Sequence, residues 1–292
     1  MKTLGSNYQF ARAEKWRLWL HRERWDARLW PEILRHLEEQ APARHPRTSR
    51  LQDPTRGSGE GLYLKIYYRW DSFGSVKDLL RDSKALRALK QGLALRERGF
   101  QTPLVVAAGE ERQLGLLQRA FLLSVPVAGL PLNQFLSARL ARRLSGEALR
   151  RKRRHIDRLA REIRRMHALG FVHGDLVPSN IFLRGDDEEV EFCYMDNDRT
   201  RRYPPWLAQR LWKRNLIQLN RFVLAGISLQ DRLRFLRAYL AHAQLRAARQ
   251  RRLLRWLERK TRQRRRECER IDSRVSFREL MRWNGPFTQD IK

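Results

Sequence analysis

The stretch HGDLVPSNIFL, residues 173–183, places three polar side chains directly before an apolar segment. His173, Asp175 and Asn180 share a short loop that also contains a glycine and a proline, which are typical turn residues. The apolar residues IFL that follow are typical of a strand. Two interpretations fit this stretch by itself: a polar turn before an edge strand, or a loop that presents catalytic groups.

The elements around this stretch favour the second interpretation. Apolar residues at helical spacing predict a helix over 145–169, which ends at Gly170. The loop, the strand IFL and an acidic turn at 185–189 come next, and the strand VEFCYM then leads into Asp196. A second carboxylate at a strand end therefore follows the loop that carries Asp175.

Transfer of a phosphoryl group from a nucleotide explains these residues in this order. The reaction needs oxygen ligands for Mg²⁺, a cation on the nucleotide phosphates and a carboxylate that faces the acceptor hydroxyl. Asp175 suits the last role, Asn180 and Asp196 suit the metal, and Asp198 is a candidate helper. His173 is expected to hold the loop by hydrogen bonds. The sequence thus predicts an ATP- and Mg²⁺-dependent phosphotransferase with an alcohol group as acceptor.

The N-terminal half is expected to combine helices with short strands. Residues 8–40 look helical, and 41–61 form a loop rich in proline, glycine and serine. The run LYLKIYY, residues 62–68, is typical of a strand whose alternation puts Lys65 opposite the leucine face. The remaining elements expected in this half are a helix over 75–98 and strands over 103–108 and 114–123.

The C-terminal half is mostly helical, with two long helices expected over 205–224 and 229–268. A small strand-rich half followed by a helical half is the order of elements in a two-lobed kinase. We therefore expect an α+β, protein-kinase-like fold with a β-rich N-lobe and a larger helical C-lobe. The expected boundaries are a helical N-terminal extension at 1–45 and a kinase-like domain at 46–292, with its N-lobe at about 46–125, its C-lobe at about 126–292 and a basic C-terminal helix at about 246–270.

Five segments between residues 60 and 242 resemble one family within the protein-kinase-like superfamily, the lipopolysaccharide core kinases (Kdo/WaaP). They are RERGFQTPLVVAAG, HGDLVPSNIFL, YMDNDRTRRY, KRNLIQLNRF and LRFLRAYL. The resemblance implies a kinase that uses ATP and Mg²⁺ to phosphorylate a sugar hydroxyl, of Kdo or heptose, in the lipopolysaccharide inner core of Gram-negative bacteria. It also implies that Asp175 is the catalytic aspartate, that Asn180 and Asp196 are metal ligands, and that Lys65 contacts the nucleotide phosphates.

The sequence departs from the kinase pattern in two places. The helix over 75–98 has no glutamate to pair with Lys65, since Ala88 falls near the expected position. The glycines of RGSGEG, residues 56–61, abut the lysine strand and are typical of a turn rather than of a phosphate-binding loop. Two alternatives therefore stay open: a kinase of another small molecule or of protein, and a degenerate pseudokinase that binds anionic membrane or nucleic acid.

The charge of the chain predicts an anionic partner. The 62 Lys and Arg residues exceed the 32 Asp and Glu residues, which gives a net charge of +30, and such an excess repels itself unless anions lie nearby. A lipopolysaccharide core or lipid A acceptor and an anionic membrane surface both fit. Nucleic acid is not favoured, because no recognised binding motif is present. Arg199, Arg201 and Arg202 follow Asp196 and suit the carboxylate or phosphates of an acceptor.

Two basic segments are candidates for membrane contact. The segment KWRLWLHRERWDARLW, residues 15–30, interleaves tryptophans with arginines, which suits either an interfacial helix or a helix packed on the small lobe. The segment RRLLRWLERKTRQRRR, residues 251–266, is expected to be a solvated, cationic part of the last helix.

The expected location is the cytoplasm, peripheral on the cytoplasmic face of the inner membrane. Cys193 and Cys268 are far apart and lack nearby Cys or His partners, which excludes a disulfide framework and suits a reducing compartment. Residues 1–30 lack the apolar core of a signal peptide, and the uncharged run 120–138 is interrupted by prolines and a glycine.

Overall fold

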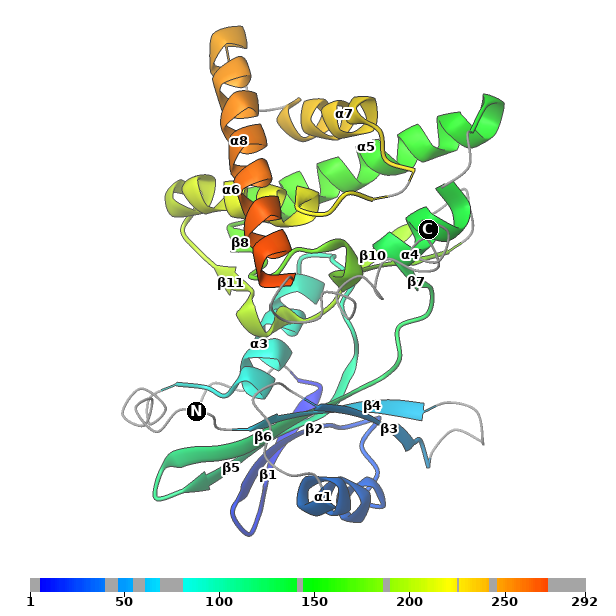
Figure 1. Cartoon of the computed structure of the whole chain (residues 1–292). Coiled ribbons are helices and arrows are strands. Elements are labelled where there is room, and N and C mark those ends of the chain that lie inside the picture. The colour runs from blue at the N-terminus through cyan, green and yellow to red at the C-terminus, as the bar shows by residue number, and fades with distance from the viewer. Residues whose placement is uncertain are drawn as a thin grey trace. The chain divides into compact units, whose positions relative to one another are not determined.

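The computed structural model describes the chain in two compact units, whose elements are labelled in Figure 1. The sheet unit comprises Met1–Val127 and Asp196–Arg199, and the helical unit comprises Ala128–Met195 and Thr200–Lys292. Within these units the described residues are 6–39, 47–54, 61–68, 81–140, 144–185, 190–224, 226–241 and 246–272.

The sheet unit contains one antiparallel sheet with the strand order β1-β2-β5-β6-β4-β3. Its strands are β1 (Tyr8–Ala13), β2 (Trp16–His21), β3 (Arg47–Gln52), β4 (Gly61–Tyr68), β5 (Val105–Gln113) and β6 (Leu116–Ser124). Its helices are α1 (Leu29–Glu39), α3 (Lys84–Arg96) and the 3₁₀ turn η3 (Asn197–Arg199).

Two hydrophobic clusters cover the two faces of this sheet. Leu62, Leu64 and Ile66 of β4 are buried in one cluster, to which α1 contributes Leu29, Ile33 and Leu37. The helix α3 contributes Leu86 and Leu89 to the other cluster, and Figure 1 shows α1 and α3 on opposite sides of the sheet. Each fully buried leucine or isoleucine stabilises the fold by roughly 1.5–3 kcal/mol. The strand predicted at 62–68 is confirmed, and its alternation leaves Lys65 half-buried on the face opposite the leucines.

The helix predicted over residues 8–40 is wrong at its N-terminal end. Residues 8–21 form the hairpin β1–β2, and only α1 is helical. Trp16, Leu18 and Leu20 alternate with exposed or half-buried residues along β2 and enter the core. A separate helical extension at 1–45 is wrong for the same reason, because β1 and β2 are strands of the main sheet.

The tryptophans of the segment 15–30 belong to the interior of the sheet unit. Trp16 packs edge-on against Trp30 at 5.9 Å and also contacts Phe121 at 5.5 Å between ring centroids, and Trp25 packs against the same cluster. The interfacial helix considered for this segment is therefore wrong, since these rings pack against other aromatic side chains in the core.

The helical unit consists of long helices with three short strand pairs. The helices are α4 (Leu132–Leu140), α5 (Gly146–Ala168), α6 (Pro205–Asn220), α7 (Leu229–Leu240), α8 (Ala247–Asp272) and the 3₁₀ turn η2 (Pro178–Asn180). The strands are β7 (Leu130–Pro131), β8 (Phe171–Val172), β9 (Ile181–Arg184), β10 (Glu191–Tyr194) and β11 (Arg201–Arg202), paired as β10-β9-β7 and β11-β8. The single helix expected over 229–268 is wrong, because this range contains α7 and most of α8 as two helices.

The end of α5 fixes where the candidate catalytic loop begins. Gly170 follows the helix with φ +86°, and a Cβ at this position would lie 2.2 Å from the carbonyl oxygen of Tyr203. Only glycine fits this close approach, so the chain can turn directly into β8 and the loop beyond it.

A buried ion pair between Lys152 and Asp231, 2.6 Å long, joins α5 to α7.

No helix in the described part of the chain is long and apolar enough to cross a bilayer.

Candidate active site

In the sheet unit, Lys65 of β4 forms an ion pair with Asp196. The two residues are 131 positions apart in the sequence. Asp196 has a left-handed backbone conformation (φ +57°), which aspartate tolerates better than most residues and which often marks a functional position. Both side chains keep part of their surface exposed. The carboxylate partner of Lys65, which the sequence did not reveal in the helix at 75–98, is therefore Asp196. Ala88, near the position where a glutamate was sought, is buried on α3.

Asp198 adds a second carboxylate beside this pair. It lies in η3, which packs on α3, and it is largely buried. Burial and the neighbouring charge of Asp196 raise the pKa of Asp198, while Lys65 opposes the shift. Two carboxylates lie close together beside one lysine. A divalent cation would stabilise this group, because it offsets the repulsion between the two carboxylates.

In the helical unit, Asp175 and Asn180 share one tight loop. The carbonyl oxygen of Asp175 accepts hydrogen bonds from the Val177 backbone N–H (2.9 Å) and from Nδ2 of Asn180 (3.0 Å). Pro178 opens the 3₁₀ turn η2 that ends at Asn180. The loop therefore fixes the amide orientation of Asn180, whose Oδ1 accepts no hydrogen bond within the described residues.

His173 is fully buried and holds the same loop from inside. Its Nδ1 accepts a hydrogen bond from the Asp175 backbone N–H (3.1 Å), and its Nε2 lies 2.9 Å from the carbonyl oxygen of Met195. Since a carbonyl only accepts, Nε2 carries the proton. The structural role predicted for His173 is confirmed by these two bonds, which connect the loop to the residue that precedes Asp196.

The helix α6 supplies a clamp that sequence reasoning missed. Asn215 is fully buried, and its Oδ1 lies 3.0 Å from the backbone nitrogen of His173, while its Nδ2 donates to the carbonyl oxygen of the same residue. Gln218, one helical turn later, donates to the Gly174 carbonyl oxygen (2.9 Å) and accepts from the Leu176 backbone N–H (3.3 Å). Residues three apart share a helix face, so the two amides together satisfy four backbone groups of the loop.

A buried histidine of α5 completes this clamp. Nε2 of His167 lies 2.9 Å from Oδ1 of Asn215, and Nδ1 lies 2.8 Å from the hydroxyl of Tyr239. Burial lowers the pKa of His167 to about 4, so the ring is neutral at pH 7. The neutral ring donates to Asn215 and accepts from Tyr239, which orients the Asn215 amide toward the loop.

The residues present suit a magnesium nucleotide. Asp196 and Asp198 of the sheet unit offer carboxylate oxygens, and Asn180 of the helical unit offers an amide oxygen; such oxygens are the ligands that Mg²⁺ prefers. Within the described ranges, no group of three or more His, Cys, Asp and Glu side chains could hold a metal by itself.

The structure thus brings the predicted residues together in two pairs. Lys65 lies with Asp196 in the sheet unit, and Asp175 lies with Asn180 in the helical unit. The first pair places a cation beside a carboxylate, and the second places a carboxyl-bearing residue in a loop that is held by hydrogen bonds.

Three solved structures are similar to this chain, and the first of them supports a kinase-like fold. The structure of WaaP in complex with acyl carrier protein is similar with a TM-score of 0.56 and 24% identity, over 81% of this chain and 95% of that one. The PknI kinase domain of Mycobacterium tuberculosis gives a TM-score of 0.38 and 17% identity, over 75% of this chain and 93% of that one. The Rio2 kinase of Chaetomium thermophilum, in an ADP/Mg²⁺-phosphoaspartate complex, gives 0.36 and 18%, over 78% and 70%. No curated protein matches the sequence.

The family comparison is more specific than the structural one. The model of the lipopolysaccharide kinase (Kdo/WaaP) family matches residues 49–239, which span β3 to α7 and include all four predicted site residues. The chain therefore belongs to the lipopolysaccharide kinase (Kdo/WaaP) family and has the protein-kinase-like fold.

Proposed function

We propose that this protein transfers the γ-phosphoryl group of ATP to a sugar hydroxyl, of Kdo or heptose, in the lipopolysaccharide inner core. The observation that carries the proposal is the ion pair between Lys65 and Asp196, in a chain that belongs to a family of lipopolysaccharide kinases. A lysine and a carboxylate at this position are the groups that a phosphotransferase needs at the nucleotide phosphates.

Each site residue has one role in this reaction. Lys65 binds the nucleotide phosphates and releases Asp196 when they arrive. Asp196 and Asn180 would hold Mg²⁺, which neutralises phosphate charge when bound. Asp175 orients the acceptor hydroxyl and accepts its proton as the new P–O bond forms. The clamp of Asn215 and Gln218 supports this role by fixing the backbone on both sides of Asp175.

The acceptor would be recognised through its negative charge. Arg201 and Arg202 form the exposed strand β11, and Arg199 is exposed at the end of η3. Guanidinium groups bind carboxylates and phosphates through paired hydrogen bonds, which suits the carboxylate of Kdo and the phosphates of lipid A. With its net charge of +30, the protein would work in the cytoplasm at the anionic face of the inner membrane.

A protein partner is part of the proposal. The relative WaaP was solved in complex with acyl carrier protein, and a partner protein with an acidic surface would find complementary charge on this chain. A pull-down with purified acyl carrier protein at low and high salt tests this. Retention at low salt and release at high salt is the expected result, while no retention at low salt would exclude this partner.

The test of the reaction is transfer of labelled phosphate from ATP to purified inner-core glycolipid. Asp175→Asn should lower the rate by at least about a hundredfold, which is the usual contribution of a positioned base. Asp196→Asn should also lower the rate strongly, because it removes a carboxylate ligand of Mg²⁺. Asp157→Asn is the matched control, since Asp157 is a half-buried aspartate of α5 whose ion pair, among the described residues, is with Arg234 at 3.8 Å. Full activity of both site variants would refute the assignment.

Two further measurements separate the alternatives. Faster transfer to soluble sugars or peptides than to the glycolipid would indicate a different kinase. Calorimetry with ATP should show affinity that depends on Mg²⁺, whereas a pseudokinase scaffold would show little.

A further inference from the structure

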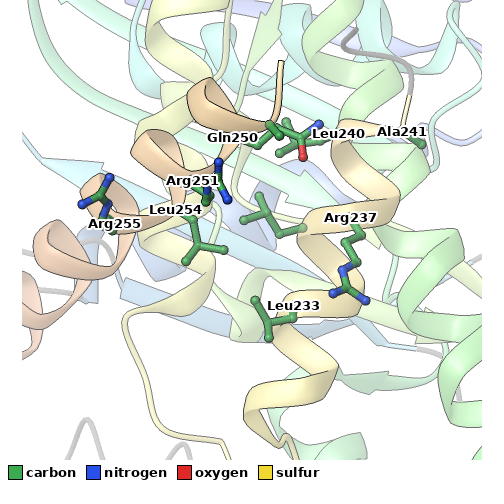
Figure 2. A pocket seen from close by; sticks show the side chains of 10 residues that line it. Leu233, Arg237, Leu240, Ala241, Gln250, Arg251, Leu254 and Arg255 are labelled. Atoms are coloured by element: carbon green, nitrogen blue, oxygen red, sulfur yellow. The ribbon is translucent and has the colours of Figure 1, made fainter. Parts of the chain in front are cut away.

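The helices α7 and α8 line a groove that contains none of the candidate active-site residues. Its volume is about 670 Å³, which lies within the range of roughly 300–1,000 Å³ for small-molecule sites. Figure 2 shows Leu233 of α7 and Leu254 of α8 on facing sides of this space. Leu236 and Leu240 of α7 also line it, so both helices contribute an apolar wall.

Arginines border this apolar strip. Arg251 lies on α8 within the groove, and Figure 2 shows Arg237 and Arg255 at opposite margins, one on each helix. None of the three guanidinium groups forms an ion pair within the described part of the chain, and all three residues are exposed. Within the described part of the chain, the groove is therefore an apolar channel with unpaired positive charge at its edges, which suits an amphiphile of opposite charge.

The cationic face of α8 continues beyond the groove. Arg259, Arg262 and Arg266 follow Arg255 at intervals of four, three and four residues, which places them along one side of the helix. A row of arginines attracts an anionic lipid surface. Two turns of a protein helix, about 11 Å long and 10–12 Å in diameter, would occupy roughly 850–1,200 Å³, which exceeds the volume of the groove, so a single ligand chain fits it better.

We propose that the α7–α8 groove binds an anionic phospholipid, with one acyl chain between the leucines and the phosphate on Arg251, Arg237 and Arg255. The binding is independent of catalysis, because none of these residues belongs to the candidate active site. It would hold the enzyme on the bilayer through one lipid molecule in addition to the general attraction between charges.

The test uses lauroyl lysophosphatidylglycerol below its critical micelle concentration, with affinity measured by calorimetry. Arg251→Gln/Arg255→Gln should weaken binding on the order of tenfold or more, given about 1 kcal/mol for each basic residue near an anionic lipid. The matched control is Arg249→Gln/Arg252→Gln, which removes the same charge from two exposed positions of α8 that do not line the groove. The control should stay within about twofold of the wild type, because its arginines lie outside the groove.

The contribution of the acyl chain is tested separately. Leu233→Asn and Leu254→Asn, one on each helix, should each weaken binding several-fold while the circular dichroism and melting curve stay unchanged. Glycerol 3-phosphate, which has the phosphate without a chain, should bind at least tenfold more weakly than the lysolipid.

Three outcomes would overturn the proposal. The first is an equal loss of lysolipid affinity in the two double arginine variants. The second is equal affinity for the lysolipid and for lauroyl lysophosphatidylcholine. The third is binding of an acidic amphipathic peptide without any binding of the lysolipid. The last outcome would assign the groove to a protein partner. Asp175→Asn should bind the lysolipid normally, so failure of the groove and failure of the proposed reaction remain distinguishable.

Discussion

Replacement of Asn215 by leucine should destabilise the helical unit strongly. Leucine has a similar volume but no polar atom, and Asn215 is completely buried. The substitution would leave three buried groups without their partner: Nε2 of His167, and the backbone N–H and C=O of His173. Each unsatisfied buried group costs about 1–3 kcal/mol, and apolar burial of the leucine offsets part of the total. We expect the free energy of unfolding to fall by about 3–5 kcal/mol.

The assay is urea denaturation followed by circular dichroism, combined with the rate of phosphate transfer to glycolipid. Activity should fall further than the folded fraction does, because the clamp positions the backbone beside Asp175. Asn220→Leu is the matched control on the same helix, since Asn220 accepts one side-chain hydrogen bond, from Arg232 at 2.8 Å. The free energy of unfolding of this control should fall by only about 1 kcal/mol. A loss below about 1 kcal/mol for Asn215→Leu, with normal activity, would show that the clamp does not hold the loop.

Three other predictions follow from buried or paired charges. The pKa of His167 is about 4 in the folded protein and about 6.5 in the unfolded chain, so the unfolded chain binds the proton first as the pH falls. The free energy of unfolding should therefore be unaffected above pH 6.5 and should fall by up to about 3 kcal/mol as the pH drops toward 4. Equal free energies of unfolding at pH 7 and pH 4.5 would contradict this. Lys152→Met should lower the free energy of unfolding by about 3–5 kcal/mol, since it leaves Asp231 buried without its cation. An unchanged urea midpoint would refute this prediction. Lys65→Gln should weaken Mg²⁺-dependent ATP binding by about 10–100-fold, the value of a lost charged hydrogen bond, and calorimetry that shows wild-type affinity would remove Lys65 from the site.

The regular elements of the helical unit were the most predictable part of the fold. The apolar spacing of α5 and its end at Gly170 are local signals, and the structure shows the helix at Gly146–Ala168. The hairpin β1–β2 was missed because its turn has no glycine or asparagine: Glu14 takes the positive φ of +50°, where a turn signal normally requires one of those residues. The alternation of Trp16, Leu18 and Leu20 was the available signal for a strand, but the tryptophans also fit helical spacing.

The candidate site was predictable only where its residues are close in sequence. Asp175 and Asn180 lie in one loop, so their spacing was informative. The partner of Lys65 was sought in the next helix, yet the pairing with Asp196 depends on a contact across 131 positions. Asn215 and Gln218 lie in the family-like segment KRNLIQLNRF, but their spacing did not indicate a role, because polar residues three apart on a helix are usually solvated. Only tertiary packing shows that they face the loop.

The most direct test of the proposed function is mass spectrometry of inner-core glycolipid from cells that lack this protein and carry back either the wild type, Asp175→Asn or Asp157→Asn. The account predicts that the wild type and Asp157→Asn each add one phosphate group to a core sugar and that Asp175→Asn, produced at the same level, adds none. Glycolipid that is equally phosphorylated with Asp175→Asn, or unchanged by the wild type, would contradict it.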